Sequence, residues 1–218
     1  MIKRIGYIFL LLLITTVVNA QSFADEIKVF KAQDSISFPP KKAILFVGSS
    51  SFRKWTDVQS YFPGYKIINR GFGGSTLPDV IRYADDIIFP YKPKQIVIYC
   101  GENDLATSDT VTAAMVTERF KSLFLLIRKK MPNVPIAFVS LKPSPSREKL
   151  WPKMIAANDA IRTFLKGKSK TAYIDVYYKM FNSDGSVKKE LFIEDNLHMN
   201  STGYTIWQKS IKPYLLKD

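Results

Sequence analysis

The chain contains five short runs of apolar residues, and segments with helical periodicity separate them. Runs that stay apolar without strict alternation are typical of strands whose two faces are both buried, as in a parallel sheet. Alternation of such strands with helices favours an α/β domain in which helices cover both faces of the sheet. The predicted strands are Ala43–Val47, Lys66–Asn69, Gln95–Cys100, Pro135–Val139 and Thr171–Val176.

The helical segments are recognised by apolar residues that repeat every three or four positions. In the longest, Thr110–Lys130, the residues Val116, Phe120, Phe124 and Ile127 fall on one stripe that would face a core. The other predicted helices are a short one within 21–40, then Leu77–Phe89, Trp151–Leu165 and Thr202–Leu216, in which Pro213 can end the helix early. No internal repeat or linker interrupts the pattern, so residues 21–218 are predicted to form one three-layer α/β/α domain.

The first twenty residues have the composition of an export signal. Lys3 and Arg4 precede the apolar run Ile8–Val18, and residues small enough for a cleavage site follow up to Ala20. This order predicts a secretory signal peptide, residues 1–20, that is cleaved after Ala20. An uncleaved anchor helix is the alternative, but the apolar run is shorter than the roughly 20 residues that a bilayer span needs. We therefore expect a periplasmic or secreted protein without a stable membrane anchor after cleavage.

Charge and cysteine content limit the partners that the protein can have. The full chain carries a formal charge of +13, which falls to +11 when Lys3 and Arg4 leave with the signal peptide. The basic residues are dispersed, which keeps a protein soluble without forming a nucleic-acid surface, so no nucleic-acid partner is predicted. Cys100 is the only cysteine and lies in an apolar run, which favours a buried thiol over a catalytic one. One histidine and one cysteine leave only carboxylates as further metal ligands, so neither a metal nor another cofactor is predicted.

Three of the predicted strands end in loops of small or polar residues. These loops are Gly48–Ser51, Asn69–Thr76 and Gly101–Asp104. In open parallel sheets, ligands bind beyond the carboxyl ends of the strands, and these ends lie on one edge. We therefore expect the chemistry at this edge, provided that the stretch Asp195–His198 reaches it as well.

His198 is the only histidine of the chain, and Asp195 precedes it by three residues. Histidine is the only side chain that titrates near neutral pH when unperturbed, so His198 is the natural proton carrier. A serine hydroxyl is a poor nucleophile until such a base takes its proton, and a carboxylate can orient the base. Ser50, which opens a predicted helical turn, is the candidate nucleophile. A lone structural histidine is the alternative, and the loops at the three strand ends argue against it.

The same loops offer hydrogen-bond donors for an anion formed on the substrate. Free backbone N–H groups at the turn that begins with Ser50 favour an anion, the loop Gly71–Gly74 allows close approach of bare backbone, and Asn103 has a side-chain amide. Each feature alone has a structural alternative: a tight or phosphate-binding turn, a dinucleotide-binding turn, or a helix cap. No lysine follows in the phosphate-loop pattern, and Phe52 stands where a Gly-x-Ser-x-Gly elbow requires glycine.

With these segments, the sequence resembles the SGNH, or GDSL-like, hydrolase superfamily. The four sequence blocks of that superfamily correspond to Gly48–Ser50, Asn69–Gly74, Gly101–Asp104 and Asp195–His198. The resemblance implies a flavodoxin-like sheet of five parallel strands in the order 2-1-3-4-5. Among its branches, the chain looks most like the platelet-activating-factor acetylhydrolase-type esterases. One position departs from the Gly-Asp-Ser pattern, since Ser49 stands where the family has aspartate.

The resemblance also implies the roles of individual residues. Ser50 is the expected nucleophile, His198 the base and Asp195 its orienting partner. The backbone N–H groups of Ser50 and Gly74 and the side chain of Asn103 would form the oxyanion hole. The aspartate that is missing from the first block is not the triad acid, so catalysis is expected to survive its replacement.

The expected function is that of an exported serine esterase that removes a small acyl group, most simply acetyl, from a carbohydrate or a related small molecule. The small acyl group follows from the resemblance and from the lack of a large apolar lid insertion. A lysophospholipase or thioesterase of the same family, and a non-catalytic carbohydrate-binding protein on a hydrolase scaffold, are the alternatives. Arg147 and Trp151 are candidate substrate-binding residues, with a surface charge and a packing tryptophan as their structural alternatives. The residues predict no particular oligomeric state.

Overall fold

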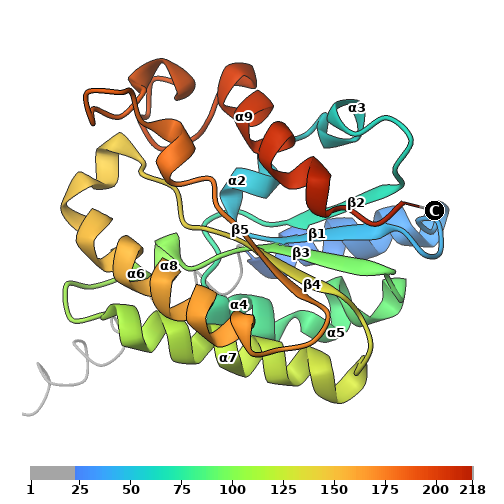
Figure 1. Cartoon of the computed structure of the whole chain (residues 1–218). Coiled ribbons are helices and arrows are strands. Elements are labelled where there is room, and N and C mark those ends of the chain that lie inside the picture. The colour runs from blue at the N-terminus through green and yellow to red at the C-terminus, as the bar shows by residue number, and fades with distance from the viewer. Residues whose placement is uncertain (1–22, 218) are drawn as a thin grey trace, which may run out of the picture. The chain divides into compact units, whose positions relative to one another are not determined.

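The computed structural model describes residues 23–217, and a five-stranded sheet forms the centre of the unit that begins at Pro39 (Figure 1). The strands are β1 (Ile44–Gly48), β2 (Ile67–Gly71), β3 (Gln95–Tyr99), β4 (Ile136–Val139) and β5 (Thr171–Ile174). They pair in the order β2-β1-β3-β4-β5, and every neighbouring pair is parallel. The predicted fold class and strand order are confirmed.

The strands coincide with the apolar runs because helices cover both faces of the sheet. Figure 1 shows α4 (Leu77–Arg82), α5 (Ala84–Ile87), α7 (Ala113–Lys130) and α8 (Trp151–Lys166) on one side, and α2 (Ser50–Arg53), α3 (Val58–Tyr61) and α9 (Ser201–Ile211) on the other. On the first side, Phe120 of α7 packs edge-on against Phe138 of β4, with ring centroids 4.8 Å apart. On the second, Trp207 of α9 packs against Tyr99 of β3 at 4.7 Å. Each such buried ring stabilises the fold by about 1.5–3 kcal/mol.

One predicted helix is broken in the structure. The segment expected to form a single helix over Leu77–Phe89 consists of α4 and α5, which are separated at Tyr83, and a 3₁₀ turn at Phe89–Tyr91 follows. The prediction of one continuous helix is therefore wrong. Tyr83 leaves helical geometry (φ −99°, ψ 10°), and its ring lies edge-on to Phe72 in the loop after β2, with centroids 6.0 Å apart. A tertiary contact thus overrides the helical periodicity.

The N-terminal unit ends at Phe38 and contains a helix over 23–36, as the apolar periodicity predicts. Residues 1–22 lie outside the described residues, so the predicted signal peptide and its cleavage after Ala20 stay predictions. Within 23–217, no helix combines the length and the apolar character that a bilayer span requires.

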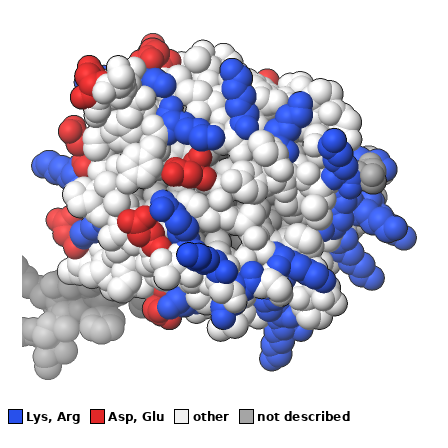
Figure 2. Space-filling view, in the orientation of Figure 1, with Lys and Arg blue, Asp and Glu red and all other residues white. Residues whose placement is uncertain are grey.

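Figure 2 shows one face of the molecule and the charged side chains on it. Figure 2 shows Lys and Arg spread over this face of the molecule, with acidic side chains among them, mainly on its left side. Mixed charge of this kind favours solubility. Among the residues that the structure describes, no three or more His, Cys, Asp or Glu side chains form a group that could hold a metal ion.

Candidate active site

The carboxyl ends of β1, β2 and β3 meet at one edge of the sheet. Gly48, the last residue of β1, pairs with Gly71 on one side and Tyr99 on the other. Gly48 has a φ of +142°, and a Cβ there would lie 1.9 Å from the carbonyl oxygen of Tyr99, so only glycine fits. The chain then turns at Ser49, the N-cap residue, and Ser50 is the first residue of α2. This close packing places the Ser50 side chain directly beyond the end of the central strands.

The turn that carries the predicted nucleophile is fixed against β2. A Cβ at Gly71 would lie 2.5 Å from the backbone nitrogen of Arg53, so the absence of a side chain lets α2 lie on the strand end. Asn69 ties the two elements together, because its amide donates to the carbonyl oxygens of Phe52 at 2.7 Å and Trp55 at 3.2 Å. The position of α2 therefore depends on glycine and asparagine of the second sequence block.

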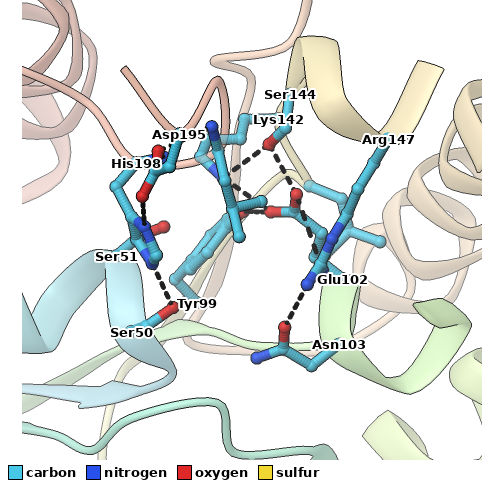
Figure 3. A network of polar contacts seen from close by, with 12 residues as sticks. Ser50, Ser51, Tyr99, Glu102, Asn103, Lys142, Ser144, Arg147, Asp195 and His198 are labelled. Carbon is cyan, nitrogen blue, oxygen red and sulfur yellow. Dashed lines mark hydrogen bonds and ion pairs between the residues drawn. The ribbon is translucent and has the colours of Figure 1, made fainter. Parts of the chain in front are cut away.

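His198 reaches this edge of the sheet from the loop before α9 (Figure 3). Its Nε2 lies 2.9 Å from Oγ of Ser50, and its Nδ1 lies 2.6 Å from Oδ2 of Asp195. Oδ1 of Asp195 accepts the backbone N–H groups of Leu197 at 2.9 Å and of His198 at 2.8 Å. Asn196, which follows Asp195 directly, has a φ of +53°, and this left-handed conformation makes the loop tight. The structure thus brings together the three residues that the sequence predicts as a triad.

The surroundings of these residues set the charges that proton transfer requires. Partial burial would raise the pKa of Asp195, but hydrogen bonds from His198 and Leu197 outweigh it and lower the pKa to about 2. Burial lowers the pKa of His198 below its ordinary 6.5; Asp195 opposes this, and the cations Lys142 and Lys54 add to it. At neutral pH, Asp195 is therefore charged and His198 neutral, the state in which Nε2 can accept a proton.

The helix that follows the histidine also contacts the turn of the predicted nucleophile. The hydroxyl of Tyr204 in α9 donates to the carbonyl oxygen of Ser51 at 2.9 Å. The Tyr204 ring stacks on Trp55, with centroids 4.7 Å apart and an interplanar angle of 18°. Consequently α9 anchors both partners of the contact between Ser50 and His198.

Asn103 lies in α6 (Glu102–Ala106), which follows β3. Gly101 occupies the N-cap position of this helix, so Asn103 is not its cap. Nδ2 of Asn103 donates to the carbonyl oxygen of Ser75 at 3.1 Å, and Oδ1 accepts from Nη2 of Arg147 at 2.8 Å. Figure 3 shows the amide nitrogen directed to the side of the predicted nucleophile. This position suits an oxyanion donor, and that role stays a prediction.

The loop after β2 contains the predicted donor Gly74 and a residue that the sequence analysis did not single out, Ser75. Gly74 is exposed, has a φ of +68°, and no atom lies within 4 Å of the position that a Cβ would take, which leaves space for a substrate. Ser75 is fully buried; its Oγ lies 3.2 Å from the carbonyl oxygens of both Gly48 and Phe72, and its own carbonyl accepts from Asn103. Ser75 thus connects the ends of β1, β2 and β3.

A group of buried polar residues lies beside Asn103, and no pattern in the sequence predicts it (Figure 3). The carboxylate of Glu102 accepts hydrogen bonds from the hydroxyls of Tyr99 and Ser144, both at 2.5 Å, and from Nζ of Lys142 at 2.7 Å. These four residues are called the Glu102 cluster below. Burial would raise the pKa of Glu102, but the cations Lys142 and Arg147 outweigh it and lower the pKa, so the carboxylate is charged at neutral pH.

The two predicted substrate-binding residues line two different cavities. Arg147 lines one of about 730 Å³ between α6 and the segment after β4. Trp151, at the start of α8, lines a groove of about 610 Å³ and packs edge-on against Phe181 at 5.6 Å, while its Nε1 donates to the carbonyl oxygen of Ser144 at 3.1 Å. Among the described residues, neither lining includes the predicted nucleophile or base. Substrate contact by Arg147 and Trp151 stays a prediction.

Comparison with known families matches residues 34–206 to the GDSL-like Lipase/Acylhydrolase family. The match covers most of the chain, from before β1 into α9, and includes all four loops described above. A comparison with curated proteins gives no match.

Solved structures share the fold. A protein of Streptococcus pneumonia, provisionally described as a platelet activating factor, is 21% identical with a TM-score of 0.80, and the similarity covers 94% of this chain and 99% of that chain. A GDSL-like lipase of Bacteroides thetaiotaomicron is 21% identical with a TM-score of 0.72, covering 86% and 96%. A catalytic mutant of an acetylxylan esterase from Geobacillus stearothermophilus is 14% identical with a TM-score of 0.63, covering 79% and 93%. At these identities, the likeness establishes a common architecture.

Proposed function

Because this chain belongs to the GDSL-like lipase/acylhydrolase family, we propose that it is a serine esterase that hydrolyses small O-acyl esters, most simply acetyl esters, of carbohydrates or related molecules. The observation that carries the proposal is the hydrogen-bonded series from Ser50 Oγ through His198 to Asp195, with distances of 2.9 and 2.6 Å. In keeping with the signal peptide predicted in residues 1–20, the enzyme would act after export, in the periplasm or outside the cell.

In the proposed first half of the reaction, His198 Nε2 takes the proton of Ser50 Oγ as the oxygen attacks the ester carbonyl carbon. The carbonyl oxygen becomes an oxyanion, and the backbone N–H groups of Ser50 and Gly74 and the second N–H of the Asn103 amide stabilise it. The tetrahedral intermediate then expels the alcohol oxygen, which takes the proton from His198. The acyl group remains on Ser50 as an ester.

In the second half, water replaces the alcohol. His198 takes a proton from the water, whose oxygen attacks the acyl carbon, and the second tetrahedral intermediate expels Ser50 Oγ, which regains its proton from His198. In both halves, Asp195 holds the proton of Nδ1 and stabilises the imidazolium that forms between the two transfers. The charged state of Asp195 near neutral pH suits this role.

Two observations support a small acyl group. Within residues 23–217, the loops that surround Ser50 carry no large apolar insertion that could cover a long acyl chain. The Geobacillus protein that shares this fold is described as an acetylxylan esterase. A lysophospholipase, which acts on a long acyl chain, would instead need an extended apolar surface next to the nucleophile.

The acyl chain proposal is tested with p-nitrophenyl esters from acetate to decanoate, and with an acyl thioester. We expect kcat/KM to be greatest for acetate and to fall by about tenfold or more by the octanoyl ester, because the proposed site would hold a methyl group and would have no room for a longer chain. Ser50→Ala is the control for background hydrolysis. A maximum at long chains, or a preference for the thioester, would favour the lysophospholipase or thioesterase alternative, and no hydrolysis of any ester would favour a binding protein.

An aromatic groove supports a carbohydrate as the alcohol part of the substrate. The groove of about 610 Å³ is lined by Trp151, Tyr178 and Phe181 among others. Tyr178 is 58% exposed although its ring is large and mostly apolar. Open aromatic rings with polar groups at their edges suit sugar rings, which have one apolar face and hydroxyls around the rim.

Tyr178→Ala is therefore expected to raise KM for acetylated xylo-oligosaccharides by about 2- to 10-fold, the equivalent of a contact worth about 0.5–1.5 kcal/mol. KM and kcat for p-nitrophenyl acetate should stay unchanged, because that substrate has no sugar. Tyr214→Ala is the matched control: Tyr214 is 44% exposed, and its carbonyl oxygen accepts from Gln95 at the amino end of β3, far along the sheet from the loops. Equal KM values of the Tyr178 variant and the wild type for the xylo-oligosaccharides would show that the groove does not bind the substrate.

A further inference from the structure

The side-chain amide of Asn103 is held at both of its polar atoms. Nδ2 donates to the carbonyl oxygen of Ser75 at 3.1 Å, and Oδ1 accepts from Nη2 of Arg147 at 2.8 Å. If the amide turned by 180°, its oxygen would face the Ser75 carbonyl and its NH₂ group would face the guanidinium, and both contacts would be repulsive. The two contacts therefore fix the direction of the NH₂ group, and its second N–H remains for another acceptor.

Arg147 spans two consecutive side chains of α6. While Nη2 donates to Asn103, Nη1 lies 3.7 Å from Oε1 of Glu102 (Figure 3). The backbone of Arg147 departs from helical geometry inside the 3₁₀ segment Pro145–Leu150, with a φ of −121° and a ψ of 26°. Its side chain is only 17% exposed. Nη1 is buried and makes no hydrogen bond with a described residue, so its attraction to the Glu102 carboxylate is an ion pair only. Because a guanidinium is a rigid planar fork, the hydrogen bond of Nη2 and the ion pair of Nη1 together restrict its position.

The ion-pair partner of Arg147, Glu102, is itself buried and hydrogen-bonded on several sides. Glu102 is 3% exposed, and Tyr99, Ser144 and Lys142 all donate to its carboxylate at 2.7 Å or less. Breaking these contacts would leave a buried charge without partners, which is strongly unfavourable. The Glu102 cluster is thus a fixed support, and Arg147 connects it to the amide of Asn103.

We propose that Arg147 is a positioning residue that orients the Asn103 amide as an oxyanion donor, and that the Glu102 cluster holds Arg147 in place for this purpose. The inference rests on the proposed function, because it takes Asn103 as a donor to the oxyanion. It differs from the substrate contact that the sequence predicts for Arg147. A substrate contact acts on KM, whereas orientation of a group used in the transition state acts on kcat.

The test is a double-mutant cycle on p-nitrophenyl acetate with Arg147→Met, Asn103→Ala and the double variant. Asn103→Ala should lower kcat by about 10²–10³-fold with little change in KM, as for other lost oxyanion donors. Arg147→Met should lower kcat by about 10- to 100-fold, because displacement of a catalytic group by about 1 Å costs up to about 10²-fold. In the double variant, Arg147→Met should add less than about twofold to the loss, since no amide remains to be oriented.

Two further variants separate orientation from charge and from stability. Arg147→Lys keeps the charge but not the fork, so it should restore only part of the kcat that Arg147→Met loses. Arg128→Met is the matched control for the loss of a half-buried arginine that makes hydrogen bonds. The Arg128 guanidinium donates to the carbonyl oxygens of Ser169 and Lys170, both at 3.2 Å, just before the amino end of β5. The Arg128→Met variant should have a lower Tm and an unchanged kcat.

Several results would overturn the proposal. A raised KM with unchanged kcat in Arg147→Met, or additive losses in the double variant, would assign a substrate contact instead. A wild-type kcat in Arg147→Met would leave the residue without a role in catalysis. A crystal structure of Arg147→Met gives a readout that does not need activity: the proposal requires the Asn103 side chain to leave its contact with Ser75, and an unmoved side chain refutes it. Hydrolysis that persists in Ser50→Ala would instead refute the proposed function, which keeps the two failures distinct.

Discussion

His198→Ala is expected to lower kcat for p-nitrophenyl acetate by about 10⁶-fold, the loss found when the base of a serine–histidine pair is removed. The chain contains no other histidine that could take its place. Nε2 lies 2.9 Å from Oγ of Ser50, so its loss removes the proposed acceptor of the hydroxyl proton. Steady-state kinetics, with Ser50→Ala as the reference for complete loss, measures the effect.

Chemical labelling and rescue check the cause of this loss. A fluorophosphonate should label Ser50 in the wild type and fail to do so at a comparable rate in His198→Ala, because the hydroxyl is no longer activated. Added imidazole should restore part of the rate if the space of the missing ring is open to solvent. Substantial hydrolysis by His198→Ala that still requires Ser50 would indicate another base. Labelling at Ser49 or Ser51 would mean that the nucleophile has been misassigned by one residue.

Asp195→Asn is expected to lower kcat by about 10⁴-fold, and the geometry gives the reason. Oδ1 of Asp195 accepts two backbone N–H groups, from Leu197 and His198. An asparagine would keep its oxygen there and turn its NH₂ group toward Nδ1 of His198. Nδ1 would then have to accept, which places the ring proton on Nε2, the atom that must take the proton of Ser50. The variant keeps its hydrogen bonds but stabilises the wrong tautomer.

The pH profile provides a second measurement on the same variant. In the wild type, the pKa of His198 lies below 6.5, so kcat/KM should be constant near neutral pH and fall only as the pH drops through that lowered pKa and the base becomes protonated. Asp195 favours the imidazolium, so its replacement should move this acidic limb to still lower pH. Asp184→Asn is the matched control, because Asp184 likewise accepts the N–H of Ser186 at 2.8 Å but lies on an exposed turn away from His198. An unchanged limb in Asp195→Asn would contradict the coupling.

The sheet and its order could be predicted because continuous apolar runs leave few alternatives. β1 and β3 differ from the predicted strands by one residue at one or both ends. The place of Ser50 follows from the sheet, since strand ends of a parallel sheet meet at one edge. That His198 reaches this edge from the loop before α9 follows only from the resemblance to the SGNH superfamily. The sequence does not predict the break of the helix at Tyr83. The Tyr83 ring contacts Phe72, and this contact depends on the path of the loop after β2, which the helical periodicity does not reflect.

The Glu102 cluster could not be predicted from the sequence, for a different reason. Glu102 and Lys142 are 40 residues apart, and charged residues after a strand usually indicate a solvated loop. Both residues are buried because α6 and the segment after β4 pack over neighbouring strand ends. The sequence composition of these segments does not indicate this burial. For the same reason, the sequence pointed to Arg147 but not to its contacts with Glu102 and Asn103, which exist only once both segments are packed together.

The contacts of α9 with the turn of Ser50 make the active-site geometry depend on a segment that is synthesised late. Ser50 and His198 stand 148 residues apart, and the Tyr204 contacts that anchor the turn come from the last eighteen residues. A growing polypeptide can form the turn of Ser50 early, since N-terminal segments leave the ribosome first, but His198 can reach that turn only once the loop before α9 and α9 itself have docked. The proposed mechanism therefore predicts that ester cleavage begins only after α9 has docked on the turn of Ser50.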